Sequence, residues 1–282
     1  MFQYAFAYAL SLKYSAVISV ELSLLQGRDQ AIAGNTPRRY ELDVFGVCPE
    51  QISKGLLQRK IRRSRNILYR LLFLKRKISC IEEEEFGFFP EFVQVRLPVY
   101  LNGYFQSEDY FLGFNHEIKK LFTFPDIATV HSHQEYLQSI QAAECPVSVH
   151  FRRGDYVTDP VFNNNHGVCS FDYYNAGMRY IHSKHPEASF YFFSDDIDQI
   201  EKEFSDSGYK IVFVKTVNTI PAWVDMMLMS KCHHHVIANS SYSWWGAWLA
   251  DYKNKIVVAP DKWFADTSRK YDHIIPAGWE VL

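Results

Sequence analysis

Two adjacent arginines follow directly on an apolar stretch of the chain. The sequence PVSVHF at 146–151 has the composition of a buried strand, and Arg152 and Arg153 come next. A guanidinium keeps its charge at any working pH and offers a fork of N–H groups that matches phosphate oxygens, so the pair indicates an anion site. Neighbouring residues of a strand point to opposite faces, so only one arginine can easily enter a crevice at the strand end. Because His150 and Arg152 share a face, Arg152 is the better candidate.

Two more polar stretches follow apolar runs. SFYFFS leads into a pair of aspartates, and HHVIAN ends in an asparagine that two serines follow. Ligands of an open parallel sheet bind beyond the carboxyl ends of its strands, so all three stretches are expected to face one crevice. Carboxylates can accept from the adjacent N–H donors of guanine, and a helix beginning at the serines would offer hydroxyl and backbone N–H groups to an anion. The pattern predicts a site for a guanine nucleotide diphosphate, with contacts from Asp195, Asp196, Asn239, Ser240 and Ser241.

Each of these residues also has a structural interpretation. Ser240 by itself is typical of a helix N-cap, and Arg153 could pair with a surface carboxylate. Asp155, in the RGD tripeptide after the strand, could orient an arginine instead of touching a ligand; an adhesion role for that tripeptide carries little weight. A cluster of three tryptophans is more typical of packing between helix and sheet than of sugar platforms. These are Trp244, Trp245 and Trp248.

Two further patterns could suggest a metal. The acidic run at 195–198 resembles the clusters that hold Mg²⁺ or Mn²⁺, but an arginine already supplies positive charge there. The three histidines at 233–235 start a strand, whose alternation sends neighbours to opposite faces, so they are not expected to share an ion. The five cysteines are odd in number and widely spaced, which indicates reduced thiols in a cytosolic protein. We therefore expect no metal and no cofactor.

The elements that would position this chemistry alternate between strand and helix through the second half of the chain. Such alternation predicts a parallel sheet covered on both faces. The boundary between two domains is expected near 125–145. The expected strands are 146–151, 189–194, 209–214, 234–239 and 255–260, and the expected helices are 131–143, 172–185, 197–205, 222–231 and 242–252.

The first half of the chain opens on an expected helix at 2–12 and a strand at 16–22. A doubly wound domain normally begins with a strand and a glycine-containing turn, so we expect the natural protein to begin further upstream. Residues 52–77 then carry ten basic and no acidic side chains, with apolar residues near helical spacing. This stretch fits a solvated helix face, or a helix lying on an anionic membrane surface. The glutamates at 82–85 are alternative partners for it.

Composition narrows the class of partner. The net charge is −2 and 22% of residues are charged, which argues against binding nucleic acid through bulk positive charge. No segment reaches the ~18 apolar residues of a membrane span, and the first residues lack the basic region of a signal peptide. A cytoplasmic location is therefore expected, with possible peripheral contact at the inner membrane surface through 54–77.

Taken together, three motifs resemble the bacterial-type α-1,2-fucosyltransferases of glycosyltransferase family 11. No one motif alone would suffice, but their order and spacing make chance similarity improbable. Three weaker matches extend the resemblance nearly from end to end. The motifs are HFRRGDY at 150–156, FFSDD at 192–196 and NSSYSWWGAWL at 239–249, and the weaker matches are MFQYAFAYAL at 1–10, LNGYFQSEDYF at 101–111 and APDKWF at 259–264.

The resemblance implies two Rossmann-like domains in a GT-B-like arrangement, an acceptor-side domain over 1–130 and a GDP-fucose-binding domain over 131–282. It implies inverting transfer of L-fucose from GDP-β-L-fucose to a sugar hydroxyl, usually the 2-OH of a galactose on a glycan, without a metal. Arg152 would bind the β-phosphate and stabilise it as it leaves, as the catalytic residue. The implied substrate-binding set is His150, Arg152, Arg153, Asp155, Asp195, Asp196, Asn239, Ser240 and Ser241.

One departure from the family pattern leaves alternatives open. Members usually carry a strand and a GGLGNQ turn before MFQYA, and this chain starts at Met1. The rivals are a fucosyltransferase of another linkage, a nucleotide-sugar-binding or adhesion protein without turnover, and a metal-dependent GT-A-like transferase. The general base also stays open among Asp155, Glu108 and Asp109.

Overall fold

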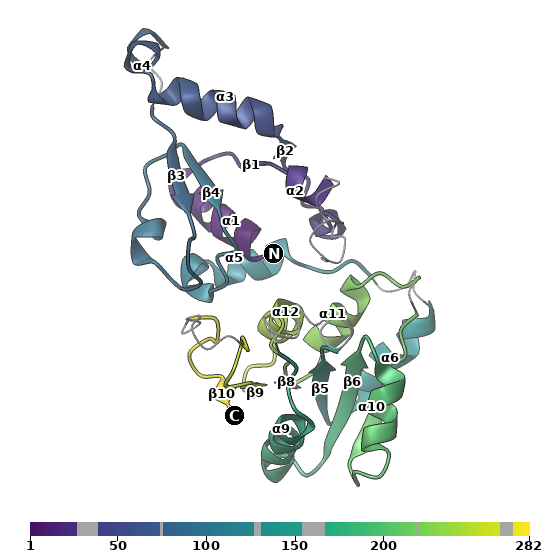
Figure 1. Ribbon diagram of the computed structural model, residues 1–282. Coiled ribbons are helices and arrows are strands. Elements are labelled where there is room, and N and C mark those ends of the chain that lie inside the picture. The colour runs from purple at the N-terminus through teal and green to yellow at the C-terminus, as the bar shows by residue number, and fades with distance from the viewer. Residues whose placement is uncertain (27–38, 74–75, 127–130, 154–166, 218, 266–272) are drawn as a thin grey trace. The chain divides into compact units, whose positions relative to one another are not determined.

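The chain forms two compact units (Figure 1). The computed structural model describes residues 1–26, 39–73, 76–126, 131–153, 167–217, 219–265 and 273–282. Unit 1 comprises Met1–Thr123 and Arg269–Pro276, and unit 2 comprises Phe124–Ser268 and Ala277–Leu282. The C-terminal part of the chain therefore contributes a segment to unit 1, which the expected division at residue 130 does not include.

Unit 2 is built on one six-stranded sheet with the order β10-β9-β8-β5-β6-β7. All of its strand pairs are parallel, as the alternation of strands and helices predicts. The five expected strands are confirmed, and a short sixth strand at the C-terminal end was not predicted. The strands are β5 (Cys145–Phe151), β6 (Ala188–Ser194), β7 (Lys210–Phe213), β8 (His234–Val236), β9 (Val257–Ala259) and β10 (Glu280–Val281).

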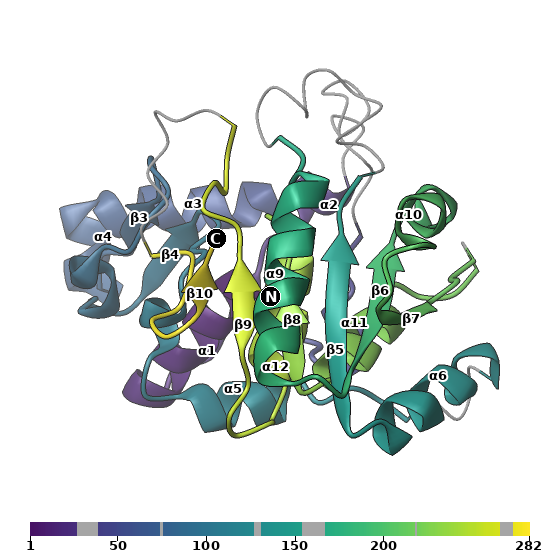
Figure 2. The same cartoon turned by 90° about the horizontal axis from the view of Figure 1, so that it is seen from below.

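The five expected helices of unit 2 are also present, and they cover both faces of the sheet. They are α6 (His131–Ala142), α9 (Phe171–Lys184), α10 (Ile197–Phe204), α11 (Trp223–Ser230) and α12 (Ser241–Leu249). Figure 2 shows α9 on one side of the sheet, in front of β8, with its axis running along the direction of the strands.

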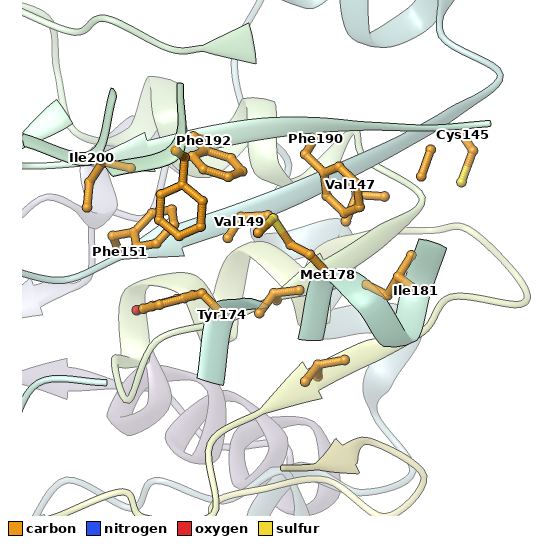
Figure 3. Close-up of a cluster of buried hydrophobic side chains, with 14 residues drawn as sticks. Cys145, Val147, Val149, Phe151, Tyr174, Met178, Ile181, Phe190, Phe192 and Ile200 are labelled. Carbon is orange, nitrogen blue, oxygen red and sulfur yellow. The ribbon is translucent and has the colours of Figure 1, made fainter. Parts of the chain in front are cut away.

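Strand alternation decides which residues face α9 and α10. Val147, Val149 and Phe151 of β5 enter one core cluster together with residues of these two helices (Figure 3). Met178 of α9 and Ile200 of α10 belong to the same cluster, and both are fully buried. The residues of β5 between these apolar ones point to the other face, which is the face that α6, α11 and α12 cover.

Contacts on this second face are partly polar. The Tyr191 hydroxyl of β6 lies 2.9 Å from the Ser139 hydroxyl of α6. Helices α11 and α12 pack closely because Gly246 faces Met229, where an added Cβ would come within 3.1 Å of the Met229 Cβ. All three tryptophans of α12 are at most 5% exposed, which confirms their role in packing.

Unit 1 holds two separate two-stranded parallel sheets in its described residues, β1 with β2 and β3 with β4. The strand expected at 16–22 is only the two-residue β1 (Ser19–Val20). The single larger sheet of a Rossmann-like domain is not seen in this part, so that expectation stays a prediction. The remaining strands are β2 (Glu50–Gln51), β3 (Ser79–Glu82) and β4 (Val99–Asn102).

An aromatic cluster forms the centre of unit 1. Phe6 of α1 (Phe2–Tyr14) lies 5.2 Å from Phe105 and 4.7 Å from Tyr110 between ring centroids. These three rings are almost fully buried, so the aromatic residues of 101–111 serve here as core. The other helices of unit 1 are α2 (Ser23–Gln26), α3 (Lys54–Arg65), α4 (Ile67–Phe73) and α5 (Asn115–Leu121), with short 3₁₀ turns at Leu42–Phe45, Pro90–Val93 and Glu108–Phe111.

Candidate functional site

The three polar stretches predicted from the sequence lie at one edge of the unit 2 sheet. Strand β5 has β8 on one side and β6 on the other, and all three run parallel, so their carboxyl ends are neighbours. In the register of β5 and β6, Phe151 pairs with Ser194. The next residues along each strand, Arg152 and Asp195, therefore come together at the end of the sheet.

Arg152 and Asp195 form an ion pair. Arg152 donates from Nη1 to Asp195 Oδ2 over 2.9 Å, and both side chains are 30% exposed. The second oxygen of the carboxylate, Oδ1, accepts from the backbone N–H of Arg153 over 3.0 Å. One carboxylate thus holds both the side chain of Arg152 and the backbone that follows it, so the guanidinium is oriented before any ligand arrives.

Arg153 lies on a different side from Arg152. Its guanidinium carbon is 5.0 Å from the centre of the Phe171 ring at the start of α9, the side of the sheet that Phe151 also faces. Its Nε is 3.8 Å from Asp196 Oδ2, and its side chain is 19% exposed. The strand alternation expected from the sequence therefore separates the two arginines, and Arg153 is held by a cation–π contact and a longer ion pair.

His150 is a neutral, buried imidazole behind Arg152. It is 6% exposed, and its ring centroid lies 5.4 Å from that of Tyr242 in α12. The pKa of His150 is lowered to about 4, mainly because burial disfavours the charged ring; Asp195 opposes this shift, and the nearby Arg152 adds to it. Its Nδ1 is buried and has no hydrogen-bond partner in the described protein atoms. At neutral pH this imidazole adds one donor and one acceptor to the site and no charge.

Asn239 holds the loop after β8 in place. Its Nδ2 donates to the carbonyls of Gly167 (3.2 Å) and Trp263 (3.3 Å), and its Oδ1 lies 3.5 Å from the Cys169 thiol, which donates to it. The side chain is 4% exposed. Donor and acceptor ends of this amide both bind protein groups, so its observed role is structural, and its predicted contact with a substrate stays a prediction.

Ser240 is the N-cap of α12, the alternative that its position in the sequence left open. Its Oγ accepts from the backbone N–H of Tyr242 over 3.3 Å. Ser241 is the first residue of that helix, so the positive end of the helix dipole lies at the same edge as Arg152. At the other end of α12, Lys255 Nζ donates to the carbonyls of Ala247, Trp248 and Ala250 at 2.7, 3.1 and 2.9 Å.

Together these groups suit an anion. The edge holds one oriented guanidinium, a second one above an aromatic ring, a neutral imidazole and a helix N-terminus, and each is a donor of hydrogen bonds.

Asp155 lies outside the described residues, so its predicted part in the site has no structural account. The side chain of Asp196 is 46% exposed, against 30% for the side chain of Asp195.

Sequence reasoning missed two aromatic partners of the site, Phe171 and Tyr242. Helices that follow parallel strands begin at the same edge where those strands end, so the first turns of α9 and α12 were identifiable as neighbours of the site. The pattern of residues alone does not show which ring would lie against which side chain.

The two carboxylates of unit 1 that were candidates for a general base differ in their contacts. Asp109 Oδ2 lies 2.9 Å from Nδ1 of His273, a residue of the C-terminal segment that belongs to unit 1. The two side chains are 32% and 48% exposed. No signal in the sequence links these residues, which are 164 positions apart. The general base stays unassigned.

One group of possible metal ligands occurs among the described residues, at the amino-terminal edge of the unit 2 sheet. The ligand atoms of Cys145, His185 and His234 lie within 4.8 Å of one another. However, His234 Nδ1 accepts from the backbone N–H of Ile256 over 2.9 Å, so the neutral ring carries its proton on Nε2. The rings of His185 and His234 also stack, with their centroids 4.4 Å apart and an angle of 29° between their planes. The nitrogen lone pairs of the two rings therefore lie side by side and do not converge on one ion. This arrangement does not fit a tetrahedral site.

The three consecutive histidines have separate environments, as strand alternation predicts. His233 stacks on Tyr252 with ring centroids 4.0 Å apart, and His235 Nδ1 lies 2.8 Å from the Ser148 hydroxyl. They do not share one site. Among the helices that the structure describes, none has the length and apolar composition to cross a membrane.

Comparisons with known proteins agree on one family. The family model described as Glycosyl transferase family 11 matches residues 56–282. An O-antigen biosynthesis glycosyltransferase of Escherichia coli, WbnK, is 34% identical, over 95% of this chain and 92% of its own. An α-1,2-colitosyltransferase of Escherichia coli is 37% identical, over 57% of this chain and 55% of its own. Galactoside α-(1,2)-fucosyltransferase 1 of Homo sapiens is 24% identical, over 57% of this chain and 46% of its own.

Proposed function

Because this chain belongs to glycosyl transferase family 11, we propose that it transfers L-fucose from GDP-β-L-fucose, with inversion, to the 2-hydroxyl of a galactose on a glycan. Two relatives support the α-1,2 linkage through their names, the human galactoside fucosyltransferase and the bacterial colitosyltransferase. The O-antigen transferase supports a surface glycan as acceptor. Two Rossmann-like domains in a GT-B-like arrangement are part of the same proposal.

The observation that carries the proposal is the Arg152–Asp195 pair at the carboxyl end of β5. Breaking the bond between fucose and phosphate transfers negative charge to the leaving diphosphate oxygen. A guanidinium already oriented by a carboxylate needs little reorganisation to stabilise that charge. The N-terminus of α12 adds its positive dipole end at the same edge. Arg152 is accordingly the proposed catalytic residue, with the β-phosphate as its ligand.

We assign the other donor-binding residues by asking which side chains already bind protein groups. Asp195 uses one oxygen for Arg152 and the other for the backbone of Arg153, so we assign it to positioning. The side chain of Asp196 is more exposed than that of Asp195 and lies farther from an arginine, so it is the proposed acceptor for the guanine N–H donors. His150 supplies hydrogen bonds without charge, and Ser240 with Ser241 would line the phosphate.

A second candidate donor is a colitosyl nucleotide. The colitosyltransferase is more similar over the aligned part than the human fucosyltransferase, at 37% against 24% identity. Phosphate stabilisation by Arg152 would serve either sugar equally, because the leaving group carries the charge in both reactions. The choice of sugar must come from residues that touch the transferred ring.

The test is to incubate the purified protein with a soluble β-galactoside and each donor in turn, and to determine the linkage of the product by NMR. We expect an α-1,2-linked fucosyl product, with retained activity in EDTA if no metal is needed. Arg152→Lys keeps the charge but not the bidentate fork, and we expect it to lose most activity. A different linkage, or transfer from the colitosyl donor alone, would replace the proposed reaction with one of its rivals.

A protein that binds the donor without turnover is the remaining rival. Binding of GDP by calorimetry, with no product and no hydrolysis over many hours, would support it. The cytoplasmic location expected from the sequence stays a prediction.

A further inference from the structure

Helix α3 presents exposed cations that form no ion pair with a carboxylate among the residues that the structure describes. The helix begins after the N-cap Ser53, and Leu57, Ile61 and Ser64 form its inner side, where the Ser64 hydroxyl accepts from the backbone N–H of Ile78 over 3.1 Å. The exposed cations of α3 lie on the remaining surface. They are Lys54, Arg59, Lys60, Arg62, Arg63 and Arg65.

The glutamates at 82–85 do not neutralise this face. No ion pair within the described ranges joins a residue of 54–73 to a carboxylate. Glu83 instead accepts from the backbone N–H groups of Tyr104 and Phe105 at 2.5 and 3.0 Å. The alternative in which the acidic run pairs with the basic run is therefore wrong for the part of the chain that the structure describes.

Helix α4, which follows directly, exposes aliphatic side chains. Ile67, Leu68 and Leu71 are 62%, 66% and 70% exposed, and their spacing of three and four residues puts them on one side of the helix. Figure 1 shows α3 and α4 in succession at one end of unit 1, beyond β3 and β4. Cations and exposed aliphatic groups thus occupy consecutive helices at the same end of this unit.

This combination selects one kind of partner. A polyanion such as nucleic acid would attract the cations but gains nothing from three exposed aliphatic side chains. The interface of an anionic bilayer accepts both, because lipid phosphates attract Lys and Arg while the acyl boundary takes up apolar side chains. We infer that α3 and α4 form a docking surface for an anionic lipid membrane, with the aliphatic side chains of α4 inserted at the headgroup boundary.

The test is co-sedimentation of the full chain with vesicles of phosphatidylcholine containing about one third phosphatidylglycerol, against vesicles of phosphatidylcholine alone. We expect binding to the anionic vesicles that weakens as salt rises, and little binding to neutral ones. Each basic residue near such a surface contributes about fivefold to the partition coefficient. The triple variant Arg59→Gln, Arg62→Gln, Arg63→Gln should therefore bind on the order of 100-fold more weakly.

Matched variants test whether vesicle binding depends on α3 and α4 or only on the total charge and apolar surface of the protein. Lys202→Gln, Lys231→Gln, Lys253→Gln removes three exposed cations from unit 2 and should change binding less than threefold. Leu68→Ser with Leu71→Ser should weaken binding about tenfold or more, because two aliphatic side chains no longer enter the interface. Its control, Val17→Ser with Leu112→Ser, alters residues that are 90% and 64% exposed elsewhere in unit 1 and should have no effect.

Three results would contradict the inference. Equal loss in the Lys202, Lys231, Lys253 variant would mean that total charge and not α3 governs binding. Binding to a DNA duplex without binding to anionic vesicles would assign the cations to a polyanion. Absence of vesicle binding at low salt, with thermal unfolding showing a folded protein, would leave α3 as a solvated helix. The readout does not depend on transferase activity, so failure of the proposed reaction would not affect it.

Discussion

A double-mutant cycle between Arg152 and Asp195 tests the role that the structure gives to the aspartate. Asp195 holds Arg152 Nη1 at 2.9 Å and the Arg153 backbone N–H at 3.0 Å, through different oxygens. If Asp195 acts through the arginine, Asp195→Ala lowers the transfer rate only while Arg152 is present. If Asp195 binds guanine, as the sequence predicts, Asp195→Ala lowers the rate by the same factor with Arg152 present and with Arg152→Ala.

The two cases predict different losses of kcat in the double variant. Arg152→Ala removes the donor at the leaving oxygen and should lower kcat about 10²–10³-fold. Asp195→Ala leaves the guanidinium but lets it move, and a misplacement of about 1 Å costs roughly 10²-fold. Independent effects would multiply to roughly 10⁴–10⁵, whereas a shared pathway keeps the double variant near the Arg152→Ala value. The difference of about two powers of ten corresponds to about 2.7 kcal/mol of coupling.

The assay is single-turnover transfer from GDP-fucose, with the Kd of GDP measured separately by calorimetry. Asp195→Asn should fall between wild type and Asp195→Ala, since its amide has one acceptor oxygen for two donors. Stability should change little, because a pair whose side chains are both 30% exposed contributes only about 1 kcal/mol. Asp198→Ala, a nearby exposed carboxylate, is the matched control and should stay within twofold. Multiplicative losses, or a rise in the Kd of GDP with kcat unchanged, would refute the positioning role.

Three further predictions concern stability. In the folded chain the pKa of His150 is about 4, against an ordinary 6.5, so the contribution of the neutral imidazole to stability is complete above pH 6.5 and is lost as pH falls to 4. Over that window the free energy of unfolding, measured by urea titration, should drop by up to about 3 kcal/mol more in wild type than in His150→Gln. An equal dependence of this free energy on pH in the two proteins would contradict the prediction. Gly177→Ala would place a Cβ 2.9 Å from Val236 Cγ1 and should cost about 1–3 kcal/mol, whereas Gly55→Ala meets nothing within 4 Å and should be neutral or stabilising. Lys255→Met removes three hydrogen bonds at the end of α12 and should cost about 1–3 kcal/mol by thermal melting, so an unchanged Tm would show that water replaces them.

Much of unit 2 could be predicted from local patterns. Five strands and five helices of a parallel sheet follow from apolar runs and their spacing, and the confirmed elements differ from the expected bounds mainly at their ends. Strand β10 was missed because two residues are too few to show a pattern. Unit 1 was predicted less well, since its strands are two to four residues long and its centre depends on aromatic contacts between distant segments.

The sequence by itself determined that three polar stretches would meet at one edge of a sheet, because parallel strands end on the same side whatever their order. It also separated Arg152 from Arg153, because strand alternation is a local property. The partners of these residues were decided only by the tertiary structure. Strand order and register placed Asp195 against Arg152, and the start of α9 placed Phe171 under Arg153. A carboxylate or a ring has many partners of similar energy in a linear chain, and packing alone selects one.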